Sequence, residues 1–267
     1  MTLWLVEVRR ALRRRIVWVL LALAVLGCVV AGVIAFSTSA GKSLAELRLD
    51  DEHPAILEEW WVDDGGILVL GALLLPLGGL IGGASVAGAE WKAGTIVTVL
   101  TWEPRRVRVH AARTAAAAVC AAVLAFALQL VLEAALLPAV LVNGTTAGVD
   151  GGWFVSVAGL MARISLVTAL AAAVGVGLAT LGRNTAAALA VAWGWMVIGE
   201  NAVRAYKPSL GEHLLGNNAG AVLTWDTIAG ADFRRGPGAA LATLVLYAAV
   251  VVAVAAWRFH RQDVVGA

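Results

Sequence analysis

Apolar residues run along the chain in six long stretches, and shorter stretches between them hold nearly all of the charge. Each long stretch has about 20 residues, the length at which a helix crosses a hydrocarbon core of about 30 Å. We expect these stretches to span a membrane over residues 16–36, 66–87, 114–141, 155–181, 185–203 and 237–257. The predicted fold class is therefore an all-α polytopic membrane protein with six transmembrane helices, forming one domain over 1–267.

The composition supports this assignment. Of the 267 residues, 61% are hydrophobic and 14% are charged, and the mean hydropathy is +0.86. Soluble domains are about 45–50% apolar and about 25% charged. The net charge of +2 gives no reason to expect a nucleic-acid partner. Cys28 and Cys120 lie within apolar stretches, where we expect small buried hydrophobes and neither a disulfide nor a metal site.

The first 15 residues have the pattern of an amphipathic helix. Leucine, valine and tryptophan alternate at helical spacing with Glu7 and five arginines. Such a helix lies in the interface of a membrane that contains anionic lipids. The apolar stretch that follows is longer than the 7–15 residues of a signal-peptide core, so we interpret it as a retained first span.

The distribution of basic residues predicts the orientation. The N-terminus, the short 88–113 loop and the C-terminal tail are basic, which is typical of cytoplasmic segments. Both termini are then cytoplasmic, and 37–65 and 204–236 are external loops. The first external loop is acidic.

Three charged residues fall inside the predicted spans, where a charge must face protein or water. Glu133 and Arg163 lie at similar depth when counted from the external ends of their spans, so we expect them to pair. The alternatives are that each faces a water-filled vestibule separately, or that they line a substrate or proton pathway. Glu200 stands four residues before Arg204, and a local helical pair is expected there.

The second span is rich in glycine. Small residues four apart let helix backbones approach closely in a membrane. This spacing predicts helix packing through Gly78, Gly79, Gly82 and Gly83.

The 88–113 loop holds a short apolar run, Ile96 to Thr101, which predicts a short helix across the membrane surface. Pro104 ends that helix, because a proline disfavours helix at the residue before it. The loop begins Gly88-Ala89-Glu90-Trp91-Lys92-Ala93-Gly94-Thr95 and continues Leu100-Thr101-Trp102-Glu103-Pro104-Arg105-Arg106. The chain ends on an aromatic and basic tail, Trp257-Arg258-Phe259-His260-Arg261-Gln262-Asp263.

With the amphipathic N-terminus, these segments resemble the permease subunits of ABC-2-type ATP-binding-cassette (ABC) transporters. The resemblance covers the whole chain by topology, but by motif it covers mainly the 88–113 loop. It implies an exporter-like fold in the plasma (inner) membrane of a prokaryote. It also implies export of a drug, peptide, lipid or glycan, although this sequence does not identify the cargo.

The resemblance further implies that the 88–113 loop is a coupling helix seated on a cytoplasmic ABC ATPase subunit. Ile96, Val99 and Leu100 would be its apolar anchors, and Glu90 would lie near a helix start. The residues expected to take part in coupling are Glu90, Trp91, Lys92, Gly94, Thr95, Ile96, Val99, Leu100, Arg105 and Arg106.

The implied assembly has two ATPase subunits and two permeases, the second being a copy of this chain or a similar one, surrounded by membrane lipids. The glycine-rich second span and the fifth span are the candidates for the interface between the two permeases. ATP and Mg²⁺ are expected on the ATPase, because we find no nucleotide-binding motif here and expect no enzymatic activity from this chain. Two other readings stay open. One is a secondary transporter driven by an ion gradient, which would usually show an internal repeat. The other is a membrane protein that does not transport, with an assembly or sensory role.

Overall fold

The computed structural model describes residues 3–50, 53–60, 66–230 and 234–261. Within them, six helical segments are long and apolar enough to cross a membrane. The elements are α1 Leu3–Leu12, α2 Arg15–Ser39, α3 Leu44–Leu47, η1 Leu57–Trp60, α4 Val69–Lys92, α5 Ile96–Trp102, α6 Arg106–Asn143, α7 Gly151–Gly182, α8 Thr185–Gly194, η2 Trp195–Gly199, α9 Glu200–Tyr206, η3 Pro208–His213, α10 Leu215–Thr224, β1 Ile228–Ala229, β2 Arg234–Arg235 and α11 Pro237–Arg261. The fold is thus a multi-pass helical membrane protein.

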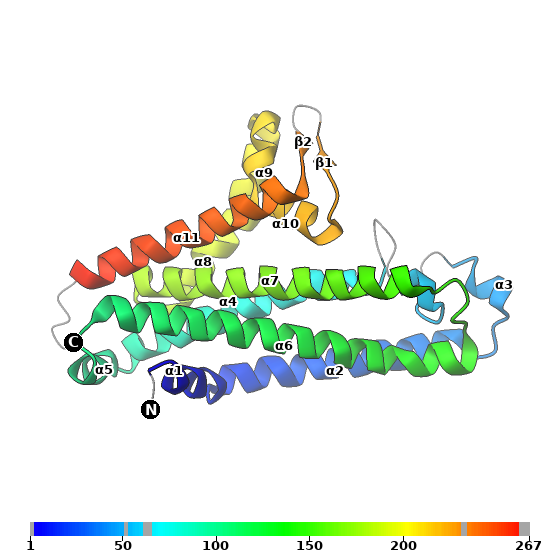
Figure 1. The fold of residues 1–267 in the computed structure, drawn as a ribbon, viewed down its shortest axis with the longest axis horizontal. Helices are drawn as coiled ribbons and strands as arrows, with labels where there is room; N and C mark the ends of the chain where they lie inside the picture. The colour runs from blue at the N-terminus through cyan, green and yellow to red at the C-terminus, as the bar shows by residue number, and fades with distance from the viewer. Residues whose placement is uncertain (1–2, 51–52, 61–65, 231–233, 262–267) are drawn as a thin grey trace.

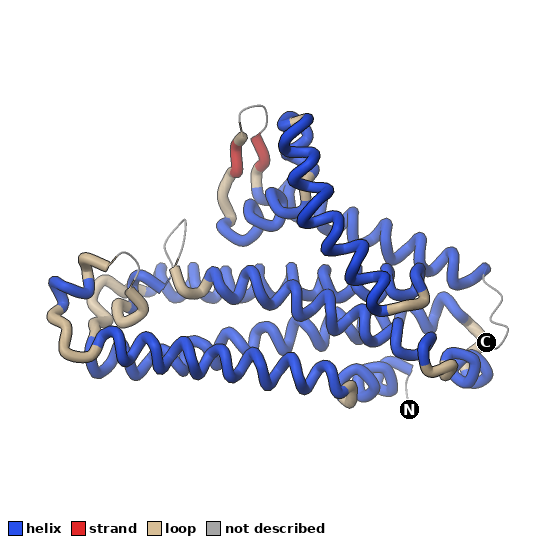
Figure 2. Tube along the Cα trace, turned by 180° about the vertical axis from the view of Figure 1, so that it is seen from behind, coloured by secondary structure: helices blue, strands red, loops and turns tan. Residues whose placement is uncertain are grey.

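Four long helices, α2, α4, α6 and α7, run side by side, and α8 and α11 lean away from them (Figure 1). Helix α5 and the two ends of the chain lie at one end of this bundle, which we name the α5 end. Seen from behind, the short β1–β2 hairpin is the only strand structure among the described residues, and it stands beside α10 (Figure 2).

The helices extend beyond most of the predicted spans. Helix α6 begins at Arg106, eight residues before the expected start, and α4 continues to Lys92. The predicted 88–113 loop is therefore mostly helical, with α5 held between two short connections. The fifth span is continuous from Thr185 to Tyr206 but contains a π-helical turn at Trp195–Gly199.

Polar side chains cap the first turns of α7 and α8. The Asp150 side chain accepts a hydrogen bond from the backbone N–H of Trp153 and starts α7. The Asn184 side chain accepts from the N–H groups of Ala186 and Ala187 and starts α8. Between α7 and α8, Arg183 has a left-handed backbone with φ of 51°. This tight turn places Arg183 at the α5 end, over the ring of Trp91.

The end opposite α5 is closed by the first inter-helix loop. Ala55, Ile56, Leu57 and Trp60 are buried in one core with residues of α2, α6 and α7. Gly144, after α6, lies so close to the Ala55 carbonyl that a Cβ there would clash. The acidic residues of this loop fall partly at 51–52 and 61–65, outside the described residues.

The glycine row of α4 packs with only one of its two faces. A Cβ at Gly79 would lie 2.6 Å from the Thr168 carbonyl oxygen, and one at Gly83 would clash with the backbone of Ala172. These two positions let α4 approach α7, as predicted. Nothing lies within 4 Å of a Cβ at Gly78 or Gly82, so the prediction of helix packing is wrong for these two within the protomer.

Candidate functional site at the α5 end

A cluster of buried charges ties three helices together at the α5 end. Glu90 of α4 forms an ion pair with Arg113 of α6, both nearly fully buried. Glu90 also lies 3.4 Å from the Arg14 guanidinium, and 3.8 Å from that of Arg10. Glu7 of α1 lies 3.7 Å from Arg113 and 3.4 Å from Arg10. We name these five residues the Glu90 cluster.

The position of Glu90 corrects an expectation from the sequence. We expected Glu90 near a helix start, facing the positive end of the helix dipole. It instead lies two residues before the end of α4, where the dipole is negative. The arginines of α1 and α6 supply the positive charge that the helix end does not, which explains why a carboxylate is stable there.

Burial shifts the protonation of two members of the cluster. Burial raises the pKa of Glu7, and the neighbouring Glu90 carboxylate adds to this effect, whereas Arg113 and Arg10 oppose it. Burial also lowers the pKa of Arg14, although Glu90 opposes this shift. The cluster therefore has a large desolvation cost, which its ion pairs offset only while all of them are present.

Trp91 connects the cluster to the end of the chain. Its ring lies under the Arg183 guanidinium, 4.9 Å from the ring centroid, and packs edge-on against Phe259 at 6.1 Å. The Phe259 carbonyl accepts a hydrogen bond of 3.5 Å from Arg106. Trp91 is thus part of the joint between α4, α11 and the α7–α8 turn, and it is not a freely exposed coupling residue. Gln262 and Asp263 of the predicted tail motif lie outside the described residues.

Helix α5 forms where the sequence predicted it, but a different set of its side chains is exposed from the set we expected. Ile96 and Val99, expected as outward-facing anchors, are 3% and 8% exposed and belong to the interior. Leu100 is half-buried. The apolar residues that α5 presents outward are Val97 and Trp102, which is 86% exposed.

The other predicted coupling residues surround α5. Lys92, Thr95 and Arg105 are exposed. Gly94 has φ of +67°, a left-handed conformation that favours glycine, and it lets the chain turn from α4 into α5. Arg106 is half-buried through its contact with Phe259.

The expected ion pair between Glu133 and Arg163 is not formed. The Arg163 side chain donates a 3.1 Å hydrogen bond to the Leu223 carbonyl and lies 5.7 Å from the centroid of the Trp225 ring. Leu223 is in the last turn of α10, whose negative dipole end attracts a cation. The buried Glu133 Oε1 has no hydrogen-bond partner among the described residues. The similar depth of Glu133 and Arg163 along α6 and α7 did not predict the partner of Arg163, because α10 folds back against α7 and brings its own carbonyl to Arg163.

The local pair at Glu200 is confirmed. Arg204 lies 3.6 Å from the Glu200 carboxylate. Glu200 also accepts a hydrogen bond from the backbone N–H of Gly216, at 3.2 Å from each carboxylate oxygen. This residue therefore fastens α9 to the start of α10.

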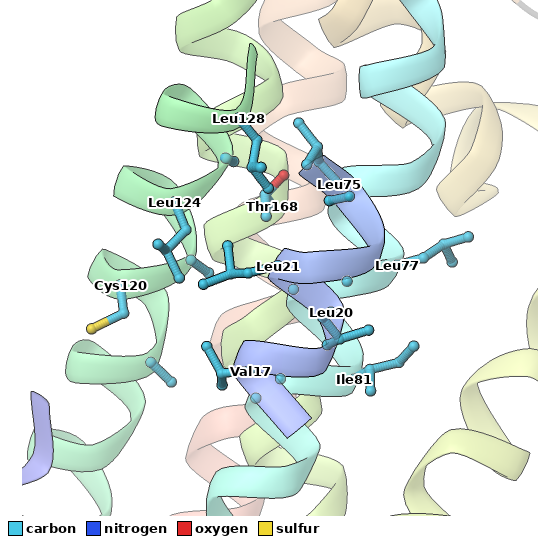
Figure 3. A pocket seen from close by; sticks show the side chains of 18 of the residues that line it. Val17, Leu20, Leu21, Leu75, Leu77, Ile81, Cys120, Leu124, Leu128 and Thr168 are labelled. Carbon is cyan, nitrogen blue, oxygen red and sulfur yellow. The ribbon is translucent and has the colours of Figure 1, made fainter. Parts of the chain in front are cut away.

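An apolar cavity adjoins the Glu90 cluster. It has a volume of about 360 Å³ and lies between α2, α4 and α6, with Thr168 of α7 also in its wall. Figure 3 shows Val17 and Leu21 of α2 and Leu124 and Leu128 of α6 around this space. Gly78 and Gly82 line it too, which explains why no neighbour packs on them.

Sequence reasoning missed several residues of this site: Glu7, Arg14, Arg113, Arg183, Phe259 and Trp102. Glu7 is the only acidic residue among the arginines of the first 15, a signal that it has a specific partner. Nothing in the spacing of Arg113 or Phe259 predicts a contact with residue 90 or 91.

No family model and no curated protein matches this chain.

Proposed function

We propose that this chain is the membrane-spanning subunit of an ABC transporter of the ABC-2 type, driven by a separate ATPase that docks on α5. The observation that carries this proposal is the placement of α5. This short helix stands at the end of the bundle that holds both chain ends, between two membrane helices, with an exposed Trp102 at its tip.

The Glu90 cluster supports a lever mechanism. A push on α5 acts on α4 and α6, because α5 is joined to each by a short connection. The buried ion pair of Glu90 with Arg113 links α4 to α6, and the contact of Glu7 with Arg113 links both to α1. Close-packed elements joined in this way move together, so closure of the ATPase would tilt α1, α4 and α6 as a unit.

The outward face of α5 supplies the docking surface in this proposal. Tryptophan is enriched among residues that dominate interface energies, and a polar rim around it excludes water. Val97 and Trp102 would be the apolar centre. The exposed Lys92 and Arg105 would belong to the rim.

The assembly would contain two ATPase subunits, which bind ATP and Mg²⁺, and two permeases in the plasma membrane of a prokaryote, with both termini cytoplasmic. This chain would not hydrolyse ATP itself. The fifth span is the better candidate for the contact between permeases. Val191 and Ile198 in that span are 61% and 71% exposed, whereas the glycines of α4 face α7 or the cavity.

The test is purification of the tagged chain from its native membranes in a mild detergent, followed by mass spectrometry of the bound proteins. The wild type should retain a P-loop ATPase. Trp102→Ala should weaken that association about 30-fold, which corresponds to ~2 kcal/mol for a residue central to an interface. Trp18→Ala, at a position 64% exposed on α2, is the matched control and should retain the ATPase.

Absence of any ATPase from the wild-type preparation, together with uptake or efflux driven by an ion gradient alone, would overturn the proposal in favour of a secondary transporter. Equal retention by Trp102→Ala and the wild type would show that α5 is not the docking surface.

A further inference from the structure

The cavity between α2, α4 and α6 has the dimensions of a site for one lipid chain. Along α4 its wall runs from Leu74 to Val86. At 1.5 Å per residue this distance is roughly 18 Å. One leaflet of the hydrocarbon core has half of the full thickness of about 30 Å, so its depth is similar to the length of the cavity wall. The cavity therefore matches the depth of the acyl chains in a single leaflet.

The lining explains what the cavity can bind. Its walls are leucine, valine, isoleucine, alanine and glycine, apart from Cys120 and Thr168. The Thr168 hydroxyl already donates a hydrogen bond to the Ile164 carbonyl at 2.7 Å. A polar ligand would lose its hydration here and find little in return, whereas a hydrocarbon chain loses nothing.

The cavity is open on its membrane-facing side. Leu23 of α2 and Leu74 of α4 both line it, and they are 60% and 63% exposed. Helix α2 packs mainly on α6, so a gap remains between α2 and α4 through which a chain can enter from the bilayer. Gly78 and Gly82 widen this gap, because they place no side chain in it.

Positive charge stands at the end of the cavity near α5. Ala11 and Leu12 line that end, and the connection from α1 to α2 follows directly. Arg13 and Arg15 are exposed there, and neither forms an ion pair with a described residue. An arginine near a membrane surface attracts anionic head groups with about 1 kcal/mol each.

We propose that the cavity holds an acyl chain of an anionic phospholipid from the leaflet at the α5 end, with its phosphate at Arg13 and Arg15. A second copy of this chain is a poorer occupant. A symmetric interface on this face would bring two sets of these exposed arginines together, and like charges oppose association. The lipid would fill the space beside α1 and thereby support the Glu90 cluster. The inference does not depend on an ATPase partner.

The experiment is a titration of the delipidated protein, followed by native mass spectrometry. The two probes are phosphatidylglycerol and phosphatidylcholine with identical chains. The wild type should bind one phosphatidylglycerol tightly and phosphatidylcholine less tightly. Gly82→Leu fills the cavity where nothing lies within 4 Å of the new Cβ, and it should weaken the binding of both lipids about tenfold.

Two further variants separate the chain from the head group. Arg13→Gln combined with Arg15→Gln should weaken phosphatidylglycerol about 30-fold and phosphatidylcholine by a smaller factor, because the choline charge already offsets the phosphate of that lipid. Gly27→Leu, on α2 but outside the cavity and also free of neighbours within 4 Å, is the control and should bind like the wild type.

Equal lipid binding by Gly82→Leu and Gly27→Leu would overturn the cavity site. Equal affinity of the wild type for the two lipids would overturn the head-group assignment. Loss of a dimer peak in Gly82→Leu with unchanged lipid binding would show that a second copy covers this face.

Discussion

Removal of Arg113 should be far more damaging than removal of an exposed arginine that forms an ion pair on the same helix. Arg113 is 2% exposed and faces two carboxylates, those of Glu90 and Glu7. Arg113→Gln would leave both carboxylates buried with only Arg10 and Arg14, which are partly solvated. Breaking a buried pair in this way costs about 3–5 kcal/mol.

The comparison is with Arg108→Gln. Arg108 lies 3.3 Å from Glu103, and its side chain is 60% exposed. Exposed pairs of this kind contribute about 0–1 kcal/mol. The two arginines are five residues apart on α6, so the same substitution is made in the same helix and only the burial differs.

The assay is reversible unfolding in mixed micelles, followed by tryptophan fluorescence, for Arg113→Gln, Glu90→Gln and the double variant. Arg113→Gln should lose more than Glu90→Gln, because only the former leaves two unbalanced carboxylates. The double variant should be more stable than the sum of the two losses predicts, since it removes one charge of each sign. Additive losses, or a loss for Arg113→Gln no larger than for Arg108→Gln, would refute the reasoning.

Three further predictions concern packing and pH. Gly83→Ala should lower the unfolding free energy by about 1–3 kcal/mol, because the new Cβ would clash with the α7 backbone. Gly82→Ala should stay within about 0.5 kcal/mol of the wild type, and equal losses for the two variants in the same unfolding assay would contradict this. Gly144→Ala should push the 53–60 loop off the end of α6, detected as faster proteolysis of that loop in the folded protein, and unchanged cleavage would contradict the close approach to Ala55. Burial raises the pKa of Glu7 above its ordinary value of 4.5, so the folded state binds a proton at Glu7 more tightly than the unfolded chain does. The contribution of protonated Glu7 to stability therefore falls as the pH rises from 4.5 through the raised pKa. Glu7→Gln should flatten that dependence, and an unchanged slope would show that Glu7 is not the group responsible.

The architecture was predictable because it depends on properties that the sequence displays directly. Long apolar stretches determine which helices can cross a membrane, and the breaks at Asn143-Gly144 and Arg183-Asn184 fall where the structure turns. The short α5 helix was also predictable, since Pro104 must end it and the apolar run is only a few residues long.

The details of the site were not predictable, because they depend on helices far apart in the chain. Glu90 was expected at a helix start, since the second span was predicted to end at residue 87. The helix instead continues to Lys92, and Gly88 lies where a Cβ would clash with Thr185 of α8. Arg163 was assigned the wrong partner for a similar reason: the segment after α9 folds back and offers it a carbonyl of α10.

Docking of an ATPase on α5 at the cytoplasmic face can be measured by chemical labelling of one cysteine introduced into that helix. Thr101→Cys, at an exposed position of α5 that leaves Trp102 in place, would be treated with a membrane-impermeant maleimide in oriented vesicles, in a background with Cys28→Ser and Cys120→Ser. If an ATPase covers α5, the cysteine should be labelled in inside-out vesicles only after urea has stripped the peripheral proteins, and it should be protected before. Labelling in right-side-out vesicles, or equal labelling of inside-out vesicles before and after stripping, would contradict it.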